Sequence, residues 1–178
     1  MFASFVQGPL VRVIPVGLVL LALQRTIFVE LQVAGVIIQV MIAMAAAAGV
    51  AGGSERGAVV GFVLGAMFDL VEGTPLGSTA TAMTIAGVVG GLLALIAADP
   101  QWWLEAIFTG LGTAAGVTMI PVVRVFIGEP APFQGRLALV IPVVTVAGMV
   151  MSPVLVPLAR WCLRMRRPEW TQPISEAE

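Results

Sequence analysis

Six long apolar stretches, separated by short polar segments, run along the 178 residues of this chain. They cover about residues 10–29, 33–50, 57–70, 76–98, 104–126 and 137–158, and a polar, basic tail follows at 159–178. A helix rises about 1.5 Å per residue, so roughly 20 apolar residues cross a hydrocarbon core of about 30 Å. The pattern predicts one transmembrane domain over residues 1–178 with about six helices. The third stretch is short, so we expect it to begin in the preceding turn or to cross incompletely.

Composition supports a membrane protein of the all-α class. Hydrophobic residues make up 59% of the chain, the mean hydropathy is +1.04, and 11% of the residues are charged. Ordinary soluble domains carry about 25% charged residues, so a soluble fold could not cover itself with this little polar surface. The sequence also lacks a basic stripe interleaved with aromatic residues, and we therefore expect no binding to nucleic acid.

The arginines predict the orientation of the bundle. An even number of spans places both termini on one side, and six of the nine arginines fall on that side. These are Arg12, Arg56, Arg160, Arg164, Arg166 and Arg167. Because cytoplasmic segments carry an excess of basic residues, we expect both termini to be cytoplasmic. The last four arginines follow the sixth span directly and are also expected to contact anionic lipid head groups.

Small residues form a regular series in the third stretch. Glycine recurs every fourth residue, at Gly53, Gly57, Gly61 and Gly65. Residues four apart share one face of a helix, and small residues there let two membrane helices approach closely. This face could pack inside the protein or hold the helix of a partner. A second pair with the same spacing, Gly87 and Gly91, is expected to pack within the protein.

Three charged residues are expected at one depth in the membrane. Arg25, Asp69 and Arg124 lie near the ends of the first, third and fifth spans, which run in the same direction. We place them toward the outer leaflet. An intramembrane charge costs about 2.5–3.5 kcal/mol and normally finds a partner. We therefore expect Asp69 to pair with Arg25 or Arg124; otherwise the arginines reach head groups separately and Asp69 faces interfacial water. Thr74 and Pro75 fit the N-cap and first turn of the next helix.

Candidates for catalysis and metal binding are scarce. The chain contains no histidine, no lysine and a single cysteine, Cys162, and no span carries two carboxylates at helical spacing. Transition metals and general acid–base chemistry depend on these residue types. We therefore expect a protein that is not an enzyme and that has no metal site and no cofactor.

One segment resembles a known family. The order Gly57-x3-Gly61-x3-Gly65-x3-Asp69-Leu70, followed by Leu76-Gly77, is similar to MreD, the rod shape-determining membrane proteins. The likeness is strongest over residues 53–93. It implies a non-enzymatic scaffold subunit of the cell-elongation complex in the bacterial inner membrane. Such a subunit docks the single-span protein MreC, works with MreB, RodA and a class B penicillin-binding protein, and helps control lateral peptidoglycan synthesis and cell shape.

The same resemblance opens an alternative. MreD proteins are similar in fold to the substrate-binding subunits of energy-coupling-factor vitamin transporters. A small-ligand-binding membrane subunit would need polar groups that converge at the outer ends of the spans. Gln24, Arg25, Asp69 and Arg124 are the candidates in this sequence.

Overall fold

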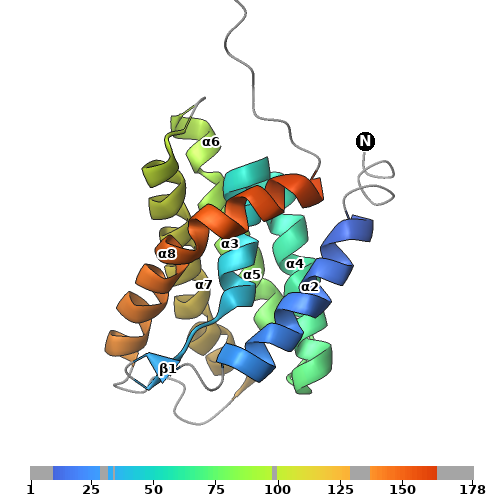
Figure 1. Ribbon diagram of the computed structural model, residues 1–178. Coiled ribbons are helices and arrows are strands. Elements are labelled where there is room, and N and C mark those ends of the chain that lie inside the picture. Colours follow the sequence, from blue (N-terminus) through green and yellow to red (C-terminus); the bar gives the residue numbers. More distant parts are fainter. Residues whose placement is uncertain (1–9, 29–31, 34, 98–99, 129–136, 164–178) are drawn as a thin grey trace, which may run out of the picture.

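The computed structural model describes residues 10–28, 32–33, 35–97, 100–128 and 137–163, which form a bundle of helices (Figure 1). The elements in chain order are α2 (Leu10–Leu23), the π-helical turn η1 (Gln24–Phe28), β1 (Gln32–Val33), β2 (Val36–Ile37), α3 (Val40–Gly52), α4 (Ser54–Glu72), α5 (Ser78–Gly91), α6 (Leu93–Ile96), α7 (Trp102–Ile127) and α8 (Leu137–Leu163). The two short strands pair in an antiparallel hairpin.

The centre of the bundle is α3. Its residues from Val40 to Val50 are all buried, and it packs against α4, α5, α7 and α8 (Figure 1). A helix that is apolar on all sides is buried either among other elements or in the membrane, and α3 is enclosed by other helices. The side chains in the alanine and glycine run of α3 are small, so several helices can pack around it at close range.

Both ends of the described chain lie at the same end of the bundle. Arg12, near the start of α2, donates from Nη1 to the Trp161 carbonyl near the end of α8 at 3.3 Å. Its guanidinium carbon also lies 5.1 Å from the centroid of the Trp161 ring. Figure 1 shows the start of α2, the α3–α4 turn and the end of α8 close together at the top. This arrangement is what an even number of passes produces.

The helices bear out a membrane bundle, although with different boundaries. Among the described residues, Ser78–Ile96, Trp102–Phe126 and Leu137–Leu163 are long and apolar enough to cross a membrane. The helices of the second and third stretches begin at other residues than predicted. The second stretch begins as a hairpin, so its helix starts at Val40 and spans 13 residues. The third stretch is a helix of 19 residues, because it begins in the turn at Ser54.

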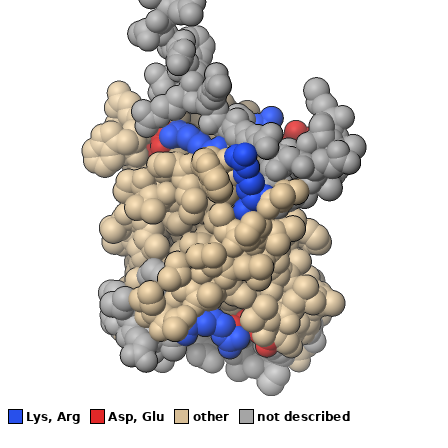
Figure 2. Space-filling view, turned by 45° about the vertical axis from the view of Figure 1, so that its right-hand side comes forward, with Lys and Arg blue, Asp and Glu red and all other residues tan. Residues whose placement is uncertain are grey.

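Charged side chains gather at the two ends of the bundle, and a belt without charged side chains separates them on the face shown in Figure 2. The chain path places the charge of η1 and the charges late in α4 and α7 at the end opposite the start of α2 and the end of α8. These are Arg25, Asp69, Glu72 and Arg124. The other described charges, at the end shared by the start of α2 and the end of α8, are Arg12, Glu55, Arg56, Glu105 and Arg160.

Candidate functional site

The glycine face of α4 lies directly on α5. A Cβ atom on Gly61 would overlap the Met83 carbonyl oxygen, and one on Gly65 would overlap the Ala80 Cα. A Cβ on Gly57 would lie 2.5 Å from the Cα of Gly49 in α3. These positions admit no side chain, because the neighbouring backbones already touch. The face is therefore an internal packing surface and is closed to a partner helix.

The glycines of α5 complete the same contact from the other side. A Cβ on Gly87 would overlap the Gly57 carbonyl, and one on Gly91 would overlap the backbone of Ser54. Gly53 differs from the others in the series. It has φ +84° and no atom within 4 Å of an added Cβ, and it separates α3 from α4. Gly53 is thus a turn residue, since residues with a side chain rarely adopt this backbone conformation.

Asp69 is 1% exposed and accepts five hydrogen bonds from the α4–α5 loop and the first turn of α5. The donors are Thr74 Oγ1 (2.7 Å) and Ser78 Oγ (3.4 Å) with Thr79 N (3.1 Å) to Oδ1, and Gly77 N (2.9 Å) with Ala80 N (3.3 Å) to Oδ2. The carboxylate therefore holds the loop against the helix that follows it.

Asp69 lies in α4 but does for α5 what the side chain of an N-cap residue usually does. The first N–H groups of a helix have no partner within the helix, and a side chain at the N-cap usually accepts one of them. The N-cap of α5 is Gly77, which has no side chain to do so. Asp69 supplies the missing acceptor, and the positive end of the α5 dipole stabilises its charge. Thr74 binds the carboxylate and does not begin α5.

The predicted pairing of Asp69 with an arginine is wrong. Neither Arg25 nor Arg124 is among the groups that bind its carboxylate. The short α4–α5 loop instead places its own donors and the first amides of α5 around the carboxylate oxygens. Arg25 Nε instead lies 3.5 Å from Glu72 Oε1, with side chains that are 53% and 30% exposed. Arg124 is exposed in the last turn of α7.

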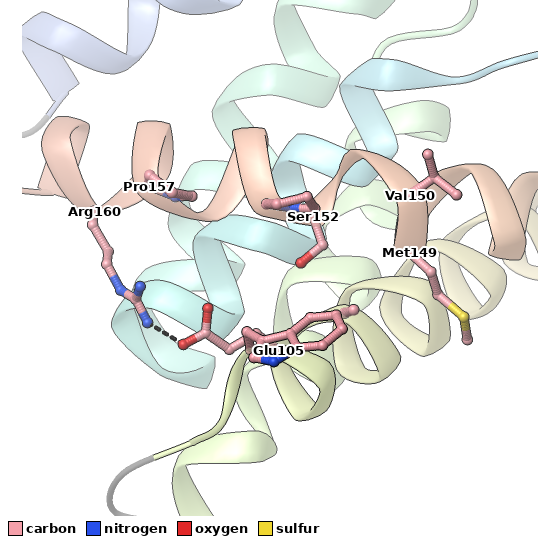
Figure 3. Close-up of a pocket in the computed structure, with 9 residues that line it drawn as sticks. Glu105, Met149, Val150, Ser152, Pro157 and Arg160 are labelled. Atoms are coloured by element: carbon pink, nitrogen blue, oxygen red, sulfur yellow. Dashed lines mark hydrogen bonds and ion pairs between the residues drawn. The ribbon is translucent and has the colours of Figure 1, made fainter.

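A pocket of about 490 Å³ opens between α7 and α8 at the end where the termini lie (Figure 3). At its polar side Arg160 Nη2 forms an ion pair with Glu105 Oε1, and these side chains are 18% and 10% exposed. The remaining lining is mostly apolar, from Trp102, Ala106, Met149, Val150, Ser152, Pro153 and Pro157. Arg160 therefore has a buried partner in addition to its expected position near head groups. Arg164, Arg166 and Arg167 lie outside the described residues.

Buried hydroxyl groups join the same two helices below the ion pair. Thr109 Oγ1 donates to the Glu105 carbonyl at 2.7 Å and lies 3.4 Å from Ser152 Oγ, while Thr113 Oγ1 donates to the Thr109 carbonyl at 2.6 Å. The three residues that carry these hydroxyl groups are at most 2% exposed. Glu105 was not predicted from the sequence. The alternation of helix direction, which placed Arg25 at the same depth as the end of α4, also places the start of α7 at the same depth as the end of α8.

Comparison with known proteins adds no assignment. No family model, no curated protein and no solved structure matches this chain.

Proposed function

We propose that this protein is a non-enzymatic scaffold subunit of the rod-shape, or cell-elongation, complex in the bacterial inner membrane. In this proposal all six longer helices cross the membrane, with both termini cytoplasmic. The protein docks a single-span MreC-like partner and, through the complex with MreB, RodA and a class B penicillin-binding protein, helps control lateral peptidoglycan synthesis and cell shape. The resemblance in residues 53–93 suggests this role.

The observation that carries the proposal is the internal use of every polar and small residue of the MreD-like motif. The glycines of α4 pack on α5, and the carboxylate of Asp69 caps α5. The motif thus makes a rigid three-helix block with α3. A block of this kind suits a subunit that positions partners. Because its glycine face is used for internal packing, a partner would dock on the outer surfaces of the helices.

The transporter alternative is less well supported by the same geometry. It requires Arg25, Asp69 and Arg124 to converge on a small molecule. Asp69 is buried under the start of α5, and Arg25 contacts Glu72 at the surface. The scaffold function therefore fits this geometry better, and the transporter function is the opposing outcome of the test.

The test is purification of the tagged protein from its own membranes in mild detergent, with mass-spectrometric identification of the proteins that accompany it. An untagged strain provides the control. We expect a single-span MreC-like protein in a stable complex, and rounding of rod-shaped cells when the protein is depleted. Recovery of a pair of transport ATPases with a coupling subunit, and unchanged cell shape on depletion, would contradict the proposal.

A further inference from the structure

The pocket between α7 and α8 has a polar and an apolar side. Figure 3 shows Arg160 and Glu105 at one side, and Met149 and Val150 at the other. Trp102 and Val150, which both line the pocket, are 78% and 70% exposed, so the pocket opens onto the outer surface of the bundle. In a membrane-spanning bundle the ends of the helices lie where lipid head groups meet acyl chains, and tryptophan is favoured at that depth.

The charges in this pocket sum to zero. Glu105 and Arg160 share one printed contact, from Nη2 to Oε1. Within the described residues, the second carboxylate oxygen and the other guanidinium N–H groups have no further hydrogen bond, so each group retains capacity for a ligand. An anion alone would approach Arg160 but would also face the carboxylate of the buried Glu105. A ligand that carries both signs avoids this repulsion and can form charge-assisted hydrogen bonds with both residues.

Two prolines of α8 leave backbone carbonyls without their usual helical donor. Pro153 and Pro157 have no backbone N–H, so the carbonyls of Met149 and Pro153 have no donor four residues later in the helix. Both of these residues line the pocket. Carbonyl oxygens left in this way at membrane depth need a donor from elsewhere. An ammonium group carries three N–H donors for the Glu105 carboxylate, whereas a fully methylated amine carries none.

We propose that this pocket binds a phospholipid whose head group is zwitterionic and carries a primary amine, such as phosphatidylethanolamine. The phosphate lies beside Arg160 and the ammonium beside Glu105. One acyl chain follows the apolar wall past Val150 and Met149. The pocket volume of about 490 Å³ is within the range that holds a bound small molecule. This lipid would link α7 to α8 at the membrane surface.

The first experiment measures lipid retention by native mass spectrometry. The purified chain is stripped of lipid and given equal amounts of phosphatidylethanolamine, phosphatidylcholine and phosphatidylglycerol with identical acyl chains. We expect phosphatidylethanolamine to be retained about tenfold more than either competitor, as loss of one charged hydrogen bond would produce. Equal retention of the three lipids, or a preference for phosphatidylglycerol, would overturn the proposal.

Two variants locate the binding. Val150→Trp changes an exposed residue, leaves the ion pair intact and fills the apolar side, so lipid retention should fall about tenfold while thermal stability is kept. Glu105→Gln should abolish the preference over phosphatidylglycerol. Arg12→Gln is the matched control, because it removes a charge at the same end outside the pocket. Unchanged retention in Val150→Trp contradicts the proposal even if Glu105→Gln fails to fold. The assay contains no partner protein, so its result is independent of the scaffold function.

Discussion

Two carboxylates three residues apart in α4 have different environments. Asp69 is 1% exposed and accepts five hydrogen bonds from the α5 side. The Glu72 side chain is 30% exposed and contacts Arg25 at 3.5 Å. An exposed ion pair contributes little to stability, because solvent screens it. A buried carboxylate whose donors depend on it contributes much more, since its loss leaves those donors without a partner.

Asp69→Asn should therefore lower the free energy of unfolding in detergent by about 2 kcal/mol or more. The asparagine loses the charge and turns an NH2 group toward backbone N–H donors. Thermal unfolding of the purified protein measures the change. Glu72→Gln is the control and should cost less than about 0.5 kcal/mol. Equal losses in the two variants would show that Asp69 does not cap α5.

The ion pair of Glu105 and Arg160 should behave as a coupled unit. Removal of one partner leaves a half-enclosed charge unpaired, so Glu105→Gln and Arg160→Gln should each cost about 3 kcal/mol. The double variant leaves neither charge and should cost clearly less than the sum. A double-mutant cycle on the free energy of unfolding measures the coupling. Strict additivity would mean that the two side chains do not interact in the folded protein.

At the scale of elements, the contact between α4 and α5 depends on backbone proximity. Gly61→Ala would place a Cβ against the Met83 carbonyl, and the two helices would have to separate. We expect a loss of about 1–3 kcal/mol in stability, the usual cost of overpacking. Gly17→Ala is the control within a helix, since its Cβ would meet side-chain atoms of Leu64 and Met67, which can move. A Gly61→Ala protein as stable as Gly17→Ala would contradict the close contact.

The sequence predicts which face of an element packs but not what packs against it. A spacing of four identified the face of Gly57, Gly61 and Gly65, because helical periodicity is local. The partner of Asp69 depended on the length of the loop to Ser78, which brought backbone amides closer than any arginine. Hydrophobicity also could not separate the strands β1 and β2 from α3, because these segments are all mostly apolar.

At the scale of the molecule, the direction of each helix was more predictable than the contacts. Alternation of direction along the chain brings together the ends of α2, α4 and α7, and it also joins the start of α2 to the end of α8. Counting the passes needs no knowledge of packing. The same count places the acidic residue at the start of α7 at the depth of the arginine near the end of α8, and so also predicts the Glu105–Arg160 pair.

The orientation in the membrane can be tested with single cysteines in a Cys162→Ala background. Glu55→Cys lies in the exposed first turn of α4, at the end that the termini share, and Leu76→Cys lies in the α4–α5 loop at the opposite end. Leu76 is 74% exposed, so a reagent can reach it. The excess of arginine on the side of the termini predicts that this side is cytoplasmic. A membrane-impermeant maleimide should then label Leu76→Cys in intact cells, and Glu55→Cys only after permeabilisation. The reverse pattern would invert the protein and place the Glu105–Arg160 pocket in the outer leaflet, while labelling of both sites in intact cells would contradict the membrane-spanning bundle itself.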